Sequence, residues 1–97
     1  MIRHIVFFTA KDPKDRHTIL EGLQLLADIP HTQNFEVGQN QKLDRISKDG
    51  PDFVVYAEFE DEEGLKAYKE HPIYEKSIGI VRPLRDMRIA ADFTTDV

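Results

Sequence analysis

FVVYAEFEDEEGLKAYKEHPIY, residues 53–74, carries the signals of a strand, a turn, a helix and a break in immediate succession. Every second residue from Phe53 to Phe59 is apolar, and a period of two is typical of an extended strand. The acidic residues at 61–63 favour a helix start, because negative charge stabilises the free N–H groups of a first turn. Pro72 cannot continue that helix, since its ring lacks an N–H and disfavours a helical conformation in the preceding residue.

Elements of the same two kinds precede and follow this segment, and prolines mark their boundaries. Before it we expect a strand over 2–10, a helix that opens at Asp12-Pro13 and ends at Pro30, and a short strand at 35–37. After it we expect a helical segment over 73–81 and a strand over 87–93. The order β-α-β-β-α-β predicts a ferredoxin-like α+β protomer, in which two crossing helices cover one face of an antiparallel sheet.

Alternation within the strands assigns side chains to the two faces of this sheet. To the helix-covered face we assign Ile5, Phe7, Phe35, Val37, Phe53, Val55, Ala57, Phe59, Ile89, Ala91 and Phe93. To the other face we assign His4, Val6, Phe8, Glu36, Val54, Tyr56, Glu58, Arg88, Ala90 and Asp92. The second set is too apolar to face water and too polar for a dry core. A second copy of the chain, packed sheet to sheet as a dimeric α+β barrel, would cover this face and enclose a small, partly polar chamber.

Length and composition narrow the possible functions. The 97 residues make a single domain, 1–97, with one core. A formal net charge of −5 and the absence of a basic, aromatic third strand argue against a nucleic-acid partner. There is no cysteine, no His pair at metal-ligand spacing and no Gly-rich phosphate loop, so we expect no metal and no cofactor. No apolar run is long enough to span a membrane, and the start of the chain does not read as a secretory signal, so we expect a cytoplasmic protein.

Five short segments give the sequence a family likeness when they are taken in order and at their spacing. They are RHIVFF (3–8), FEVG (35–38), EFEDEE (58–63), AYKEHP (67–72) and ADF (91–93). Together they resemble the stress-responsive dimeric α/β-barrel (Dabb) family over essentially the whole chain. The resemblance implies a ferredoxin-like protomer and a homodimer, and it implies no single activity, because one fold hosts many functions.

A plant polyketide cyclase of this family, olivetolic acid cyclase, closes an aromatic ring with a Tyr and a His. By resemblance its Tyr corresponds to Tyr68. Its catalytic His belongs to a His-Pro-x-His motif, which here reads His71-Pro72-Ile73-Tyr74, so Tyr74 stands at that position. A phenol with a pKa near 10 is a poor base at neutral pH, whereas an imidazole near 6.5 is well suited.

The candidate site residues each have a functional and a purely structural interpretation. We take His4, Tyr68 and Tyr74 as candidate catalytic residues, because a His oriented by a carboxylate is a general base and a phenol is a hydrogen-bond donor. The candidate ligand-binding residues are Phe8, Tyr56, Glu58, Arg88 and Asp92. On the purely structural interpretation, His4 is a hydrogen-bonded histidine in an interface, and Glu58 and Asp92 form ion pairs with Arg88. Tyr68 and Tyr74 then serve only as aromatic packing, and His71 bonds to backbone at a helix junction.

Two functional hypotheses follow. The first is a stress-associated homodimer that binds a small apolar or aromatic molecule in or beside the barrel. The alternative is a cofactor-independent enzyme on such a molecule, of the polyketide cyclase, isomerase or monooxygenase-like kind, with His4 as general base and a tyrosine as donor to an oxyanion. An open cavity that reaches His4 would favour a ligand or a reaction over a filled interface.

Overall fold

A computed structural model of the chain describes residues 1–46 and 49–96. The strands are β1 (Ile2–Ala10), β2 (Asn34–Gln39), β3 (Phe53–Phe59) and β4 (Arg85–Thr94). The helices are α1 (Arg16–Gln24), α2 (Glu62–Glu70) and α3 (Pro72–Val81), and 3-10 turns at Pro13–Asp15 (η1) and Leu25–Asp28 (η2) flank α1. This order confirms the expected β-α-β-β-α-β protomer, with the second crossover split into two helices at Pro72.

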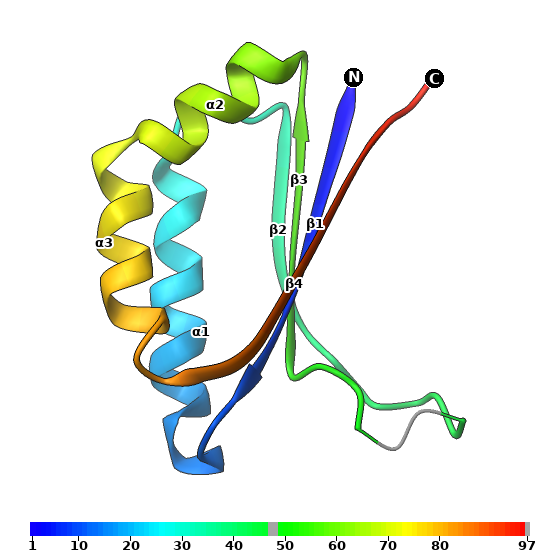
Figure 1. Cartoon of the computed structure of the whole chain (residues 1–97), viewed down its shortest axis with the longest axis vertical. Coiled ribbons are helices and arrows are strands. Elements are labelled where there is room, and N and C mark those ends of the chain that lie inside the picture. The colour runs from blue at the N-terminus through cyan, green and yellow to red at the C-terminus, as the bar shows by residue number, and fades with distance from the viewer. Residues whose placement is uncertain (47–48, 97) are drawn as a thin grey trace.

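The four strands form one antiparallel sheet in the order β2-β3-β1-β4. Figure 1 shows the sheet nearly edge-on, with α1 and α3 side by side along one face and the other face left uncovered. The loop between β2 and β3 extends from the lower end of the sheet, away from the helices (Figure 1). The protein therefore has two layers and one open sheet face.

The register corrects half of the face assignment. On β3 the prediction is confirmed, because Phe53, Val55, Ala57 and Phe59 are all buried under the helices. On β1 the prediction is wrong: Ile2, His4, Val6 and Phe8 are the buried residues, and His4 lies directly opposite Ala57. On β4 it is also wrong, because Asp92 lies opposite His4 and Ile89 opposite Phe7. Residues directly opposed across a ladder share a face. The candidates His4, Phe8, Arg88 and Asp92 therefore lie on the helix side.

The open face is more apolar than predicted. Its residues include Ile5, Phe7, Val54, Tyr56, Glu58, Met87, Ile89, Ala91 and Phe93, as the register with the buried set requires. Tyr56 donates its hydroxyl proton to Glu58 Oε2 at 2.5 Å, and Arg3 Nε lies 3.9 Å from the same oxygen. The polar cluster of Arg3, Tyr56 and Glu58 therefore interrupts an otherwise apolar face, since Phe93 lies directly opposite Arg3.

Side chains cap the helices where the sequence predicts their ends. Asp12 accepts a hydrogen bond from the backbone N–H of Lys14, and Asp61 accepts one from Gly64. His71 ends α2 and caps α3, since its Nδ1 accepts from the N–H of Ile73. The interpretation of His71 as a helix-junction residue is therefore confirmed.

Gly22 allows α1 and α3 to approach closely. A Cβ at this position would lie 2.9 Å from the Cγ2 atoms of both Ile80 and Val81, closer than side chains pack. Ser77 of α3 donates its hydroxyl proton to the Gly22 carbonyl at 2.8 Å, a buried bond between the same two helices. The absence of a side chain on α1 thus sets the spacing of the helix layer.

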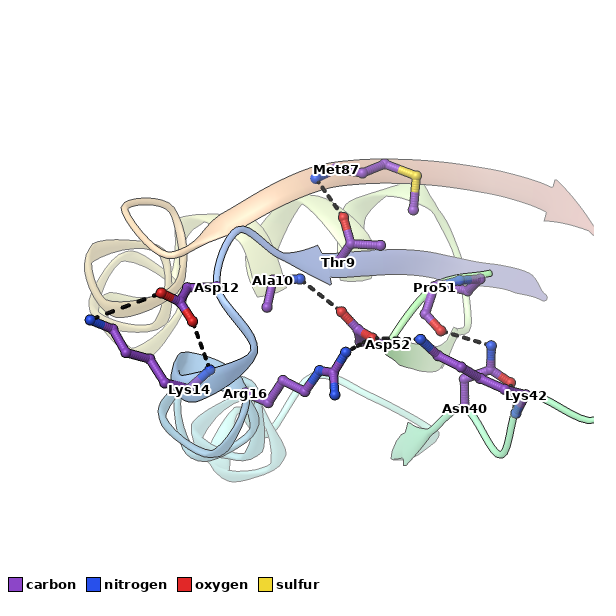
Figure 2. Close-up of polar contacts among 10 residues, drawn as sticks. All are labelled: Thr9, Ala10, Asp12, Lys14, Arg16, Asn40, Lys42, Pro51, Asp52 and Met87. Carbon is purple, nitrogen blue, oxygen red and sulfur yellow. Dashed lines mark hydrogen bonds and ion pairs between the residues drawn. The ribbon is translucent and has the colours of Figure 1, made fainter. Parts of the chain in front are cut away.

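Asp52 ties three segments together just before β3 (Figure 2). Its carboxylate accepts from the N–H of Ala10 at 2.9 Å and pairs with Arg16 at 3.4 Å and Lys42 at 3.1 Å. Burial raises the pKa of Asp52, but the Ala10 hydrogen bond and the two cations outweigh it and hold the pKa below its ordinary value. The start of α1, the end of β1 and the β2–β3 loop are thereby fixed to one another.

Within residues 1–46 and 49–96, none of the helices is long and apolar enough to cross a membrane.

Candidate functional site

A cavity of about 290 Å³ lies between the helix layer and the covered face of the sheet. β1 contributes His4, Val6 and Phe8 to its lining, and β4 contributes Arg85 and Arg88. The remaining lining residues come from the helix layer, from β3 and from the turn after α3: Leu23, Leu26, Val55, Tyr68, Tyr74, Ser77, Ile78, Val81 and Arg82. The volume is at the lower end of the range of about 300–1,000 Å³ typical of small-molecule sites.

His4, which lines this cavity, forms a hydrogen-bonded pair with Asp92. His4 is 1% exposed, and its Nδ1 lies 2.5 Å from Asp92 Oδ1. A carboxylate can only accept, so Nδ1 donates its proton and the neutral ring keeps a free lone pair on Nε2. In the part of the chain that the structure describes, the hydrogen bond of the His4 ring is through Nδ1. Nε2 is therefore available to a bound molecule.

Electrostatics keep the His4 ring neutral. Burial lowers the pKa of His4, Lys69 and Arg88 lower it further, and the Asp92 hydrogen bond and charge oppose them without reversing the direction. Asp92 itself is partly exposed, and on its far side it lines a depression between α2 and β4. The pair thus links a buried imidazole to solvent through a carboxylate, an arrangement that can accept a proton and pass it on.

Two tyrosines stand beside the imidazole. The ring centroids of Tyr68 and His4 are 6.2 Å apart, and those of Tyr68 and Tyr74 are 5.3 Å apart, each pair edge to face. Burial raises the pKa of the Tyr68 phenol above its ordinary value, the neighbouring Tyr74 adds to this rise, and Arg88 opposes it. Tyr68 therefore stays protonated and can donate a hydrogen bond to an oxygen in the cavity.

Three arginines complete the lining where α3 ends and β4 begins. Arg82 follows α3, and Arg85 and Arg88 lie on β4. Residues three apart on a regular strand point to opposite faces, but the register between β1 and β4 shifts between Phe8 and Ala10. Arg88 pairs with Phe8 and Arg85 with Ala10, so this irregularity brings both side chains to the same cavity.

The structure brings together six of the eight candidate residues. His4, Phe8, Tyr68, Tyr74 and Arg88 line the cavity, and Asp92 bonds to His4. Tyr56 and Glu58 lie on the open face and bond to each other, apart from the rest. Arg82 and Arg85 are absent from the candidates that sequence reasoning gave. The sequence has an arginine at every third position from 82 to 88, but this spacing puts side chains on opposite faces of a regular strand and so did not indicate one site.

No group of three His, Asp or Glu side chains in residues 1–46 and 49–96 is arranged to hold a metal ion. The chemistry that the site offers by itself is that of an imidazole–carboxylate pair, two phenols and three guanidinium groups.

Comparison with known proteins agrees with this architecture. Residues 2–95 match the family model described as the stress responsive A/B barrel domain (Dabb). A dimeric ferredoxin-like protein of unknown function from Thermobifida fusca YX is 31% identical, with a TM-score of 0.81 over 97% of this chain and 90% of the other. A dimeric ferredoxin-like protein from Bacteroides fragilis is 22% identical (TM-score 0.79, 97% and 95% covered). A Dabb family protein from Mesorhizobium loti is 21% identical (TM-score 0.78, 97% and 95% covered). A search of curated proteins finds no match.

Proposed function

The chain belongs to the stress-responsive A/B barrel (Dabb) family, and from this premise we propose that it binds a small, partly aromatic molecule beside His4 and moves a proton on it without a cofactor. The observation that carries the proposal is the His4–Asp92 pair, in which His4 lines a cavity of fitting size and keeps its Nε2 free of protein hydrogen bonds. Aromatic and aliphatic side chains supply the apolar walls that a small organic molecule needs.

The proposed step is abstraction of a proton from a carbon next to a carbonyl group. His4 Nε2 takes the proton, the C–H electron pair forms the C=C bond of an enolate, and the carbonyl electrons move to oxygen. The protonated imidazole is stabilised by Asp92, and a Tyr68 or Tyr74 hydroxyl donates a hydrogen bond to the oxyanion. The same enolate starts an isomerisation, in which the proton returns to another carbon, or an aldol-type ring closure.

The likeness to the plant cyclase supports this assignment only in part. Tyr68 stands where that enzyme has its catalytic tyrosine, but Tyr74 stands where it has its histidine. A phenol does not replace an imidazole as a base at neutral pH. Among the described residues, His4 is the histidine that lines this cavity. We therefore assign the role of base to His4 on β1 and not to a residue of α3.

A ligand-binding protein without turnover is the second candidate. The same cavity favours it, because binding requires the apolar walls and donors but not a free base. The two candidates differ in one outcome, which is whether a bound carbon acid exchanges its protons with solvent.

The test is deuterium exchange followed by NMR. The protein is incubated in D₂O with phenylacetone and 4-hydroxyphenylacetone, and the loss of the proton signals next to the carbonyl is timed. We expect exchange above the buffer rate, reduced in His4→Gln by about 10²- to 10⁴-fold, the usual contribution of a general base. His17→Gln is the matched control, since His17 is an exposed histidine on α1 paired with Glu21.

Exchange that survives in His4→Gln would show that another group is the base. Binding without exchange, seen as shifts of the His4 ring signals on titration, would replace the catalytic assignment with the ligand-binding one. If no aromatic carbonyl compound tested binds or exchanges, both the catalytic and the ligand-binding function are rejected.

A further inference from the structure

The cavity has a charged end that a neutral aromatic molecule would leave unused. Its lining contains Arg82, Arg85 and Arg88, although the whole chain carries a formal net charge of −5. Three arginines thus line one cavity of an acidic protein. Arg82 and Arg88 are exposed and Arg85 is half-buried, so water screens part of their mutual repulsion, and the positive potential that remains favours an anion in the cavity.

No carboxylate forms an ion pair with these guanidinium groups in the part of the chain that the structure describes. Arg3 lies beside Glu58 and Arg16 beside Asp52, but Arg82, Arg85 and Arg88 form no ion pair within residues 1–46 and 49–96. Among the ionisable groups that line the cavity, Arg88 acts on His4 and Tyr68, and its charge lowers the pKa of both. The guanidinium groups are therefore available to a ligand.

The backbone is shaped to bring two of them together. Only the register shift between β1 and β4 allows residues 85 and 88 to share a face. Strand irregularities of this kind commonly re-aim side chains next to functional sites. Met87 N–H donates to the Thr9 hydroxyl at 2.9 Å across this irregularity, which fixes it (Figure 2).

We infer that the molecule bound in this cavity carries an anionic oxygen group, a carboxylate or a phosphate, which Arg82, Arg85 and Arg88 hold at the mouth while its uncharged part reaches His4. A guanidinium group presents parallel N–H donors that match the two oxygens of either anion. The inference rests on the proposed function in taking this cavity as the ligand site. It adds that the substrate class is small aromatic or keto acids, or their phosphate esters.

The test is binding of three probes that differ in charge, followed by NMR of the His4 ring signals. The probes are 4-hydroxybenzoate, 4-hydroxybenzamide and phenyl phosphate, titrated into the wild-type protein and into Arg85→Gln and Arg88→Gln. Lys76→Gln is the matched control, because it removes one positive charge from an exposed position on α3 outside the cavity lining. Thermal melts confirm that each variant is folded.

We expect at least one anionic probe to shift the His4 signals with an affinity at least about tenfold above that of the amide. Each arginine variant should weaken the anionic probe by about tenfold and leave the amide unchanged, while the Lys76 variant should change neither. Preference for phenyl phosphate over the benzoate, or the reverse, decides between phosphate and carboxylate.

Equal binding of the amide, or equal effects of the arginine and Lys76 variants, would overturn the inference. Binding of an anionic probe without any shift of the His4 ring signals would also overturn it. These results are separable from the proposed proton transfer. Anion selectivity without deuterium exchange contradicts the catalytic step alone, and exchange without anion selectivity contradicts this inference alone.

Discussion

The carboxylate of Asp92 defines how the His4 imidazole can act. Asp92→Asn keeps an acceptor for Nδ1–H but removes the negative charge that favours a protonated ring. The pKa of His4 should then fall further, because the hydrogen bond to Asp92 and the charge of Asp92 are the two influences that raise it. We expect the deuterium-exchange rate at its plateau to fall at least about tenfold, as when an orienting partner is lost. The pH at which activity begins should also move downward.

The measurement is the exchange rate of 4-hydroxyphenylacetone against pH for both proteins. If Asp92 only held the structure together, the variant would exchange more slowly, but the inflection of its curve of rate against pH would stay at the same pH. An unchanged inflection in a folded Asp92→Asn variant would therefore contradict the role given to this carboxylate.

The neutral, buried His4 also makes folding stability depend on pH. Its pKa is lowered in the folded protein, so the unfolded chain takes up the proton first as the pH falls. The free energy of unfolding should therefore decrease from about pH 6.5, the ordinary value for histidine, down through the folded pKa, by up to about 1.4 kcal/mol per pH unit. Urea denaturation between pH 7.5 and 5 measures this slope. The slope should be smaller in His4→Gln, and equal slopes in the two proteins would refute the prediction.

The sequence allowed much of the site to be predicted at the level of single residues. A His on β1, an Asp on β4 and two tyrosines near the Pro72 break are types whose chemistry can be read without a structure, and the fold brings all four to one place. The prediction that Tyr56 and Glu58 lie near His4 was wrong, because their positions on β3 put them on the other face of the sheet. Arg85 could not be predicted, because a regular strand would direct it away from Arg88.

At the level of elements, the order and ends of the helices and strands were predictable and the phase of two strands was not. Capping residues and prolines mark helix ends locally. Asp12, Asp61 and Pro72 were therefore sufficient to predict where the helical segments begin. β1 is apolar at every position from Ile5 to Phe8, so alternation does not say which face is inside. β4 misleads more strongly, since its large apolar side chains, Ile89 and Phe93, are on the open face.

The crossing of α1 and α3 gives a test of the helix layer that is independent of the site chemistry. Gly22→Ala places a methyl group 2.9 Å from two side-chain carbons of α3, so we expect the free energy of unfolding to fall by about 1–3 kcal/mol. Gly79→Ala, on α3, is the matched control, because its Cβ meets nothing within 4 Å. It should gain about 0.5–1 kcal/mol from the higher helix propensity of alanine. Chemical denaturation compares the two, and a Gly22→Ala protein as stable as wild type would mean that the helices separate at little cost.

At the scale of the whole molecule, the distribution of exposed apolar side chains is one-sided. Among the described residues, the large exposed ones are Met1, Phe7, Leu43, Ile46, Ile89 and Phe93. None lies on a helix, and Phe7, Ile89 and Phe93 share the open face of the sheet. An exposed apolar face of this kind is typical of an interaction site. We propose that a second copy of the chain covers this face, because large apolar side chains are exposed together on it.

A single charge on that face tests the dimer. Ile89→Asp would place a carboxylate in the apolar part of the proposed interface, where it has no partner and loses water. We expect light scattering with size exclusion to show a dimer for wild type, and a dissociation constant raised at least about tenfold for the variant. Thr18→Asp adds the same charge at an exposed position on α1 and should stay dimeric. A wild-type monomer at all concentrations, or an Ile89→Asp dimer as tight as wild type, would reject this face as the interface.

The same variant separates the two places where a ligand site was expected. A chamber between two sheets would be lost when the dimer dissociates, whereas the cavity beside His4 is lined by one chain and lies on the opposite side of the sheet. Monomeric Ile89→Asp should therefore still bind 4-hydroxybenzoate or phenyl phosphate with shifts of the His4 signals, and with an affinity within about threefold of wild type. This follows because sites far apart without shared contacts act nearly independently. Binding that disappears with the dimer, in a variant whose melt is unchanged, would return the site to the barrel interior. It would also leave the His4–Asp92 pair a structural feature of the fold.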